Sequence, residues 1–374
     1  MSRPLTTGEP RGPHIVIDLA AVRENYRIVS QHVRPARTGA VLKADAYGLG
    51  AASIARTLYR SGCRDFFVAL LEEGRALREH VGRDARIFVL HGPAEGEEPA
   101  FSTWALIPVL NTLKQVRRWS RVDRPRQGQT QVAIQLDTGM HRLGLSPDRL
   151  DEAIGLLGGE GEVALFMSHL ACAEDEHHPA NHRQSRAFDD ALGARAICAE
   201  RSLANSWGAA FVPHGRDALV RPGIALFGGM ERLDVAPLKP VVRLRAPVLQ
   251  IHCVPAGEGV GYGLTGAQMA GRRIATIGIG YADGWARNLA DLGSVCFESA
   301  RLPIVGAISM DSLAVDASDP GADTLAEDDM VELIGASRSL MTVAREAGTI
   351  PYEVLVRLGP RLRRIYINDD EAVA

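Results

Sequence analysis

The chain has 374 residues, which is long enough for a barrel of about 250 residues followed by a second, smaller domain. Hydrophobic residues make up 46% of the chain and charged residues 23%, and the formal net charge of −3 excludes the strongly basic surface of a nucleic-acid partner. Residues 1–13 lack the apolar core of a signal peptide, and no later run approaches the roughly 18 apolar residues of a membrane span, so we expect a cytoplasmic protein without a membrane partner.

Short apolar runs alternate with amphipathic stretches from about residue 14 to residue 230, as in βα units. Eight runs favour a TIM-like (β/α)8 barrel over an open sheet: Val41–Lys43, Phe66–Ala69, Ile87–Leu90, Leu106–Leu110, Val132–Leu136, Val163–Met167, Leu203–Asn205 and Ala218–Arg221. Helices are expected between them, including Asp18–Val33 with an aspartate N-cap, Ala51–Leu58 and the alanine-rich Asp190–Arg201.

After Leu238-Lys239-Pro240 the pattern changes to β-rich segments separated by glycine turns. The expected strands are Val241–Val254, Arg273–Gly280, Leu302–Ile308 and Met330–Ile334, with one helix near Leu340–Ala347. We therefore predict two domains: a cofactor-binding barrel over residues 1–237 and a mainly antiparallel β domain over residues 238–374.

Chemistry in α/β folds is concentrated in the loops that follow the strands. Lys43 ends the first expected strand, although position alone also allows an ordinary surface lysine. The fifth strand runs into the segment that contains Arg142, and the sixth is followed by His169. We expect these side chains to meet at one mouth of the barrel.

Phosphate sites in such barrels usually lie after strands seven and eight, where backbone N–H groups face the anion. Asn205-Ser206 follows the seventh strand, and Arg221-Pro222-Gly223-Ile224 follows the eighth. The Ser206 hydroxyl and the amides of Gly223 and Ile224 fit a phosphate. Together with a lysine at the same mouth, they suggest pyridoxal phosphate held as a Schiff base.

Eight segments resemble, in the same order, the motifs of the alanine racemase family, and they span nearly the whole chain. They are Lys43–Gly50, Asp137–Gly144, Ser168–Ala171, Ala204–Ser206, Val220–Leu226, Ile279–Trp285, Ser309–Asp311 and Thr349–Val354. The resemblance implies an enzyme that interconverts L-alanine and D-alanine and supplies D-alanine for cell-wall peptidoglycan. It also implies a homodimer with composite active sites.

The resemblance assigns roles to individual residues. Lys43 would form the internal aldimine and act as the base on the D side. Tyr281, from the second subunit, would be the base for the L enantiomer. Arg142 would help to hold the substrate, and Met310 of the partner chain would contact the substrate carboxylate through its backbone.

The cofactor-binding residues that the resemblance implies are Lys43, Tyr47, His169, Asn205, Ser206, Arg221, Gly223, Ile224 and Tyr352, with no metal. Of these, Tyr47, Ser206, Gly223, Ile224 and Tyr352 would bind the phosphate, Arg221 would face the pyridine nitrogen and His169 would support the ring.

Racemisation needs one base on each face of a planar carbanion. Lysine and tyrosine both have reference pKa values of about 10, so cationic surroundings would have to lower both. A permanently charged arginine at the pyridine nitrogen would keep that nitrogen unprotonated and weaken the electron sink, which favours reprotonation at Cα over transamination.

Each of these residues also has a structural interpretation. Tyr281 could be an aromatic side chain packed in a strand, and Met310 could be an ordinary core residue. Arg221 could form an ion pair with Asp217. His169 could be a hydrogen-bonded histidine of the core. The shared order of the motifs favours the functional interpretations.

Other patterns are interpreted as structural. The five cysteines, Cys63, Cys172, Cys198, Cys253 and Cys296, are widely spaced and are expected to be reduced thiols. The histidines of the segment 177–182 could bind zinc on a helix, but Pro179 stands where that helix would begin, which favours a polar loop. The glycine-rich run 257–263 lacks the register of a nucleotide-binding loop and is expected to be a turn.

Two positions depart from the family pattern. Gln135 stands where many relatives have a carbamylated lysine whose negative charge orients the arginine, and we hypothesise that a bound anion or water replaces the carbamate next to Arg142. Trp207 replaces an expected small residue and would alter the surroundings of the phosphate.

Three other functions are alternatives to an alanine racemase. They are a racemase of broader range that accepts serine, a decarboxylase of similar build, and a non-catalytic pyridoxal phosphate carrier.

Overall fold

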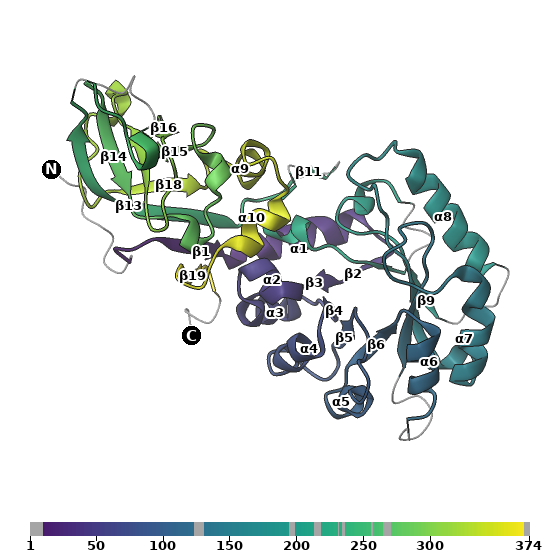
Figure 1. Ribbon diagram of the computed structural model, residues 1–374. Helices are drawn as coiled ribbons and strands as arrows, with labels where there is room; N and C mark the ends of the chain where they lie inside the picture. Colours follow the sequence, from purple (N-terminus) through teal and green to yellow (C-terminus); the bar gives the residue numbers. More distant parts are fainter. Residues whose placement is uncertain are drawn as a thin grey trace.

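The computed structural model describes residues 10–122, 131–193, 199–212, 218–230, 232–233, 236–255, 257–264 and 271–369. Figure 1 shows a parallel barrel with its helices at one end of the molecule and a sheet containing β13, β14, β15, β16 and β18 at the other. Strands β1 and β19 and helix α10 lie between these two parts. A division of the chain at residue 237 stays a prediction.

The barrel consists of short parallel strands joined in the order of the sequence. Its seven-stranded sheet contains β3 (Ala40–Val41), β4 (Asp65–Val68), β5 (Arg86–Val89), β6 (Ile107–Leu110), β7 (Val132–Gln135), β8 (Val163–Met167) and β9 (Glu200–Ser202). Strand β10 (Leu219–Val220) pairs with β2 (Arg37–Thr38), which leads into β3. The Arg221 amide donates to the Ala204 carbonyl at 3.0 Å, so β10 also joins the chain that leaves β9 and closes the ring. The expected fold class of an eight-stranded barrel followed by an antiparallel domain is confirmed.

Helices surround the barrel, and all of them except α1, which follows β1, come after strands of the barrel. They are α1 (Leu19–His32), α2 (Lys43–Gly48), α3 (Ala51–Arg60), α4 (Leu71–Arg78), α5 (Glu98–Thr103), α6 (Leu113–Trp119), α7 (Leu150–Leu157) and α8 (Pro179–Leu192). The Asp18 carboxylate caps α1 by accepting hydrogen bonds from the amides of Ala20 and Ala21, as expected from the sequence.

The second sheet has eight strands, and most of its pairs are antiparallel. Its order is β14 (Arg273–Ile277), β17 (Leu313–Asp316), β16 (Ala300–Val305), β15 (Ser294–Phe297), β18 (Met330–Ile334), β13 (Val242–Cys253), β1 (His14–Asp18) and β19 (Arg363–Ile367). Two helices, α9 (Leu340–Glu346) and α10 (Pro351–Arg357), interrupt it where the sequence predicted one. Strand β1 pairs with β13 and β19, so the chain starts in this sheet before it builds the barrel.

Two local expectations are wrong. The predicted helix Asp190–Arg201 is contradicted where it is described: α8 ends at Leu192 with Gly193 as its C-cap, and Glu200–Ser202 is strand β9, three residues before the expected strand. Residues 194–198 lie outside the described part of the chain. The polar loop predicted at residues 177–182 ends at His178, because α8 begins at Pro179: the His178 ring caps the helix by accepting a hydrogen bond from the Ala180 amide, and Pro179 occupies the first turn.

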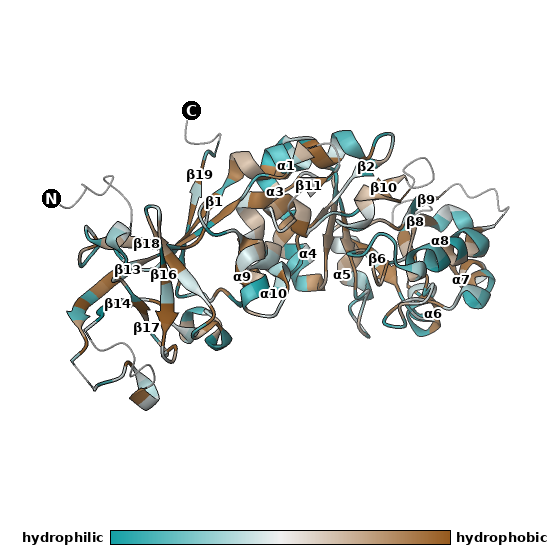
Figure 2. Ribbon diagram, turned by 90° about the horizontal axis from the view of Figure 1, so that it is seen from above, coloured by the Kyte–Doolittle hydropathy of each residue, from teal (hydrophilic) through white to brown (hydrophobic). Residues whose placement is uncertain are grey.

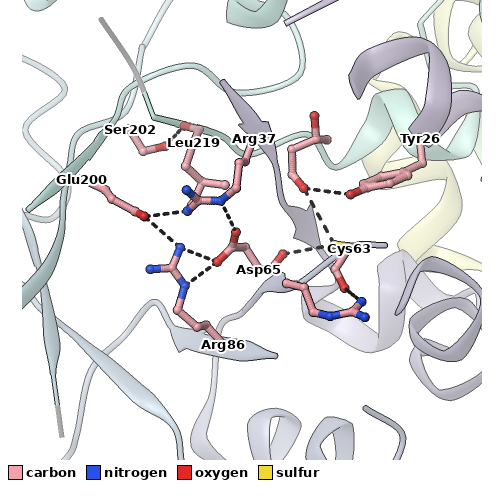
Figure 3. Close-up of polar contacts among 10 residues, drawn as sticks. Tyr26, Arg37, Cys63, Asp65, Arg86, Glu200, Ser202 and Leu219 are labelled. Atoms are coloured by element: carbon pink, nitrogen blue, oxygen red, sulfur yellow. Dashed lines mark hydrogen bonds and ion pairs between the residues drawn. The ribbon is translucent and has the colours of Figure 1, made fainter. Parts of the chain in front are cut away.

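The amino-terminal ends of the barrel strands are joined by a network of charged side chains (Figure 3). Asp65, only 2% exposed, accepts hydrogen bonds from Arg37 and Arg86, and both arginines also donate to Glu200. These residues come from β2, β4, β5 and β9. The network therefore ties distant strands at the end of the barrel opposite to the loops that follow the strands.

Apolar side chains fill the interior of both parts. In Figure 2 strands such as β17 are mainly hydrophobic, while much of α8 is hydrophilic.

The four described cysteines are free thiols. Cys63 and Cys296 are buried, Cys172 and Cys253 are free as well, and Cys198 lies outside the described residues. The run 257–263 forms turns and part of a short 3-10 helix between β13 and β14, as predicted. Among the described residues, no helix has both the length and the apolar character needed to cross a bilayer.

Candidate active site

A cavity of about 450 Å³ opens at the carboxyl ends of the barrel strands. Nine of the predicted site residues line it: Lys43, Tyr47, Arg142, His169, Asn205, Ser206, Arg221, Gly223 and Tyr352. Most of the remaining wall is apolar, with residues such as Phe67 and Met167, and the polar side chains of His91 and Gln135 also contribute to it. Side chains that are far apart in the sequence are thus brought together, because the segments after β3, β7, β8, β9 and β10 meet at this end of the barrel, and α10 adds Tyr352.

Lys43 begins a turn with an unusual backbone. Four consecutive residues without a glycine, from Ala44 to Tyr47, have φ between 52° and 59°, which is a left-handed helical turn. Such a conformation costs about 1–2 kcal/mol per residue, so the surrounding contacts must hold it. One of these contacts is the carboxylate of Glu73, which accepts a hydrogen bond from the Ala44 amide at 2.6 Å.

Glu73 is a site residue that the sequence reasoning missed. Its second carboxylate oxygen accepts hydrogen bonds from the amides of Ala69 and Leu70, at the end of β4, at 2.8 and 3.0 Å. The carboxylate therefore links the loops after β3 and β4. A capping-box motif could have signalled this role, but the residue at the N-cap is Leu70 in place of serine or threonine.

The segments after β9 and β10 form a small cradle. The Ser206 hydroxyl accepts hydrogen bonds from the amides of Gly223 at 2.8 Å and Ala225 at 3.3 Å. Ile224 lies between them, fully buried, at the start of a short 3-10 helix (Ile224–Phe227). The Asn205 side chain accepts from the Gly208 amide at 2.8 Å and fixes the turn after β9. The two segments that were predicted to bind a phosphate therefore lie together, and the phosphate itself stays a prediction.

Arg221 is a buried cation in the wall of the cavity, 4% exposed. Its guanidinium donates to the Ser168 carbonyl at 2.5 Å and to the Ser202 hydroxyl, and it lies 6.0 Å from the centre of the Phe67 ring. Asp217, the ion-pair partner considered for Arg221, lies outside the described residues. The bonds to Ser168 and Ser202 fix the direction of the guanidinium.

The electrostatic field of the cavity is positive. Burial lowers the pKa of Lys43 below that of an ordinary lysine, and the charge of Arg142 lowers it further, while Glu73 opposes the shift. Burial together with Arg221, Arg142 and Lys43 lowers the pKa of His169 to about 3. His169 is therefore a neutral ring at physiological pH and not a general acid.

Arg142 stands exposed on the loop after β7. The Asp137 carboxylate shapes this loop by accepting hydrogen bonds from the amides of Gly139, Met140 and His141. Gln135, 7% exposed, donates to the Leu143 carbonyl at 3.3 Å, next to Arg142 in the chain. The neutral amide thus contacts the backbone of the loop.

Two tyrosines meet beside the cradle. The rings of Tyr47 and Tyr352 lie 5.7 Å apart, and Tyr47 also packs edge-on against Phe227. Burial raises the pKa of Tyr47, and burial with the charge of Glu174 raises that of Tyr352 to about 12, opposed by the Trp207 indole. Both phenols are therefore neutral hydroxyls. Trp207 lies against Tyr352 and does not line the cavity.

Tyr281 and Met310 do not line this cavity. They lie side by side in the second part of the chain, 41% and 53% exposed, and the Tyr281 amide donates to the Ser309 carbonyl at 3.1 Å. The Arg287 guanidinium lies 5.8 Å from the centre of the Tyr281 ring. A role at the cavity would thus require them to act on a second copy of the chain. No group of side chains suited to a metal occurs in the described part of the chain.

Comparison with known proteins shows the family. The model for the alanine racemase N-terminal domain matches residues 17–231, and that for the alanine racemase C-terminal domain matches residues 241–366. A relative named catabolic alanine racemase from Agrobacterium fabrum is 43% identical, covering 98% of this chain and 95% of its own length.

Solved structures agree with this assignment. Alanine racemase from Bartonella henselae with covalently bound pyridoxal phosphate is 40% identical, with a TM-score of 0.88, covering 96% of this chain and 100% of that one. Biosynthetic alanine racemase from Pseudomonas aeruginosa is 35% identical, with a TM-score of 0.85, and the match covers 96% of this chain and 99% of that one. The chain belongs to the alanine racemase family.

Proposed function

We propose that this chain is an alanine racemase that interconverts L-alanine and D-alanine with pyridoxal phosphate as its cofactor. One observation carries the proposal: Lys43, Arg142 and Arg221, from three different strand ends, converge on the cavity that contains the Ser206–Gly223 cradle. Membership of the family over nearly the whole chain supports it.

The residues of the cavity fit this cofactor. A volume of about 450 Å³ is within the range of about 300–1,000 Å³ usual for small-molecule sites. The Ser206–Gly223 cradle and the neutral hydroxyls of Tyr47 and Tyr352 would bind the phosphate. Arg221 would face the ring nitrogen, and Lys43 would hold the cofactor covalently. When bound, pyridoxal phosphate supplies an electron sink that makes the α-proton of an amino acid acidic.

The proposed mechanism uses two bases. Lys43 moves the proton at Cα on the D side, and Tyr281 of the partner subunit moves it on the opposite side, because inversion requires proton transfer on both faces of a planar carbon. The lowered pKa of Lys43 increases its neutral fraction near neutral pH. Arg142, and Met310 of the partner subunit through its backbone, would orient the substrate carboxylate.

The proposal includes a homodimer in which each cavity is completed by the neighbouring subunit. Tyr281 and Met310 are adjacent and exposed, and neither reaches the cavity of its own chain. A surface that presents two such residues fits a composite site. The dimer itself is tested by the mixed-subunit experiment described below.

The activity is tested by incubating the purified protein, loaded with pyridoxal phosphate, with L-alanine in deuterated water. We expect D-alanine to appear with deuterium at Cα. Release of carbon dioxide would assign a decarboxylase instead, and the absence of any exchange at Cα would assign a carrier. Competition between L-alanine and L-serine measures the substrate range, because such pockets discriminate one small substituent by only about 1–3 kcal/mol.

We further propose that the enzyme works in the cytoplasm and supplies D-alanine for cell-wall peptidoglycan. The names of the relatives point to two different roles: the relative from Agrobacterium fabrum is named catabolic, and the one from Pseudomonas aeruginosa is named biosynthetic. A deletion strain that grows only with added D-alanine would support the supply role. A strain that grows without D-alanine but not on alanine as its carbon source would assign breakdown, and cell fractionation tests the location.

A further inference from the structure

The last strand of the chain holds the turn that carries Lys43. Arg364 lies on β19, and its Nε and Nη2 atoms donate to the Gly48 carbonyl at 3.1 and 3.0 Å. Two residues further along the strand, the Tyr366 hydroxyl donates to the Leu49 carbonyl at 2.9 Å. Because β19 is paired with β1 along its whole length, these donors project from a fixed element.

The guanidinium of Arg364 also reaches the end of helix α10. Its Nη2 donates to the Leu358 carbonyl at 2.9 Å, and its Nη1 donates to the carbonyls of Gly359 and Leu362 at 2.7 and 2.8 Å. Together with the two contacts to Gly48, these bonds engage all five N–H donors of an arginine, and every acceptor is a backbone carbonyl. The side chain therefore joins two backbone segments that are far apart in the sequence.

Both segments carry residues of the cavity. The turn that ends at Gly48 carries Lys43 and Tyr47, and α10 carries Tyr352 near its start. The Tyr47 and Tyr352 rings are 5.7 Å apart, so the distance between the segments decides whether both hydroxyls reach one ligand. The left-handed turn is unfavourable by itself and depends on contacts of this kind.

The fit between β19 and the turn leaves no free space. Gly50 has φ +93°, and a Cβ atom there would lie 1.8 Å from the Tyr366 hydroxyl. Any side chain at position 50 would therefore push the turn away from Tyr366. Neither Arg364 nor Tyr366 lines the cavity, so both act through the backbone.

We propose that Arg364 is a positioning residue of the active site, which, supported by Tyr366, sets the turn of Lys43 and Tyr47 against the helix of Tyr352. The inference rests on the proposed function for the roles of these three residues. The claim that Arg364 holds the turn in place does not depend on the proposed function.

The test compares Arg364→Lys with Arg363→Lys. The first variant keeps the positive charge but has no planar fork of donors. The second makes the same change at the neighbouring, exposed residue of β19. Three quantities are measured: hydrogen exchange of the amides of residues 43–50, the affinity for pyridoxal phosphate, and the primary isotope effects with α-deuterated D-alanine and L-alanine.

For Arg364→Lys we expect about tenfold faster exchange of the Leu49 and Gly50 amides and about tenfold weaker binding of pyridoxal phosphate. The isotope effect should rise more with D-alanine than with L-alanine, because a displaced Lys43 slows its own proton transfer. A purely structural role would lower the melting temperature without changing the ratio of the two isotope effects. Arg363→Lys should match the wild type.

Wild-type exchange and affinity in folded Arg364→Lys would overturn the proposal. If that variant does not fold, Tyr366→Phe removes a single donor and should accelerate the same amides less strongly; unchanged exchange there would also overturn it. If the wild-type protein neither binds pyridoxal phosphate nor racemises alanine, the proposed function fails, while the exchange data still decide whether Arg364 holds the turn.

Discussion

Tyr47 closes the space beside Gly223: a Cβ atom added to Gly223 would lie 2.2 Å from the Tyr47 hydroxyl and 3.0 Å from the ring carbon that bears it. Tyr47 is only 4% exposed and belongs to the left-handed turn, so it has little freedom to retreat. The glycine therefore allows the turn of Lys43 to approach the cradle formed by Ser206 and Gly223.

Gly223→Ala should destabilise the protein and weaken its hold on pyridoxal phosphate. Overpacking of this kind costs about 1–3 kcal/mol, and displacement of Tyr47 should reduce the affinity at least about tenfold. Thermal unfolding and a titration with pyridoxal phosphate measure the two effects. Adding Tyr47→Phe to Gly223→Ala removes the clashing oxygen and should restore part of the stability but not the affinity.

Gly155→Ala is the matched control. Gly155 lies in α7, and a Cβ atom there has no neighbour within 4 Å. The same substitution should stabilise the protein there by about 0.5–1 kcal/mol and leave cofactor binding unchanged. Wild-type affinity in Gly223→Ala would show that Tyr47 does not depend on this glycine.

The pH dependence of cofactor attachment should report the pKa of Lys43. Only the neutral amine attacks an aldehyde, so the rate at which cofactor-free protein captures pyridoxal phosphate should rise with pH as Lys43 loses its proton. Burial and Arg142 lower the pKa of Lys43, which places the midpoint below the value of about 10.4 for an ordinary lysine.

Replacing Arg142 changes this profile in a defined direction. Arg142→Met removes a positive neighbour, so the pKa of Lys43 and the midpoint of the profile should move to higher pH, while Arg142→Lys keeps the charge and should leave the midpoint in place. Stopped-flow absorbance of the bound cofactor measures the rates. Equal midpoints in the wild type and Arg142→Met would refute the assigned electrostatic cause.

His169 should make the protein sensitive to acid. Burial and three cations lower its pKa to about 3, whereas the unfolded chain has an ordinary histidine pKa of about 6.5. Between these values the unfolded state binds more protons, so stability falls as pH falls through this window, by at most about 1.4 kcal/mol per pH unit. In denaturant titrations at pH 6.0 and 5.0, His169→Gln should lose less stability than the wild type. An equal loss would show that the pKa of His169 in the folded state is not lowered relative to the unfolded chain.

The barrel could be predicted from the sequence because most of its strands are short apolar runs, and five of the eight expected strands lead into a segment with candidate site residues. Lys43, His169 and Arg221 were found in this way, and the structure places all three at one cavity. The end of the alanine-rich segment at Arg201 was predicted wrongly because tertiary pairing with β8 overrides helix propensity at Glu200–Ser202.

Long-range contacts explain most of what was missed. Ala44 and Ala46 are strong helix formers, and nothing local predicts their left-handed conformation, which depends on distant contacts of the turn with Glu73 and Arg364. The sequence of β1 has the pattern of any short apolar strand, and only its pairing with β13 and β19 places it in the second sheet. The roles of Tyr281 and Met310 came from the family resemblance alone.

The shared active site is the central claim, and mixing two inactive variants tests it most directly. Lys43→Ala and Tyr281→Ala subunits are denatured together, refolded with pyridoxal phosphate and assayed for alanine racemisation. If Tyr281 acts on the neighbouring subunit, half of the dimers in an equal mixture are mixed and contain one intact site each, so activity should return to about one quarter of that of refolded wild type. A mixture that forms dimers but stays as inactive as either variant alone would contradict the account.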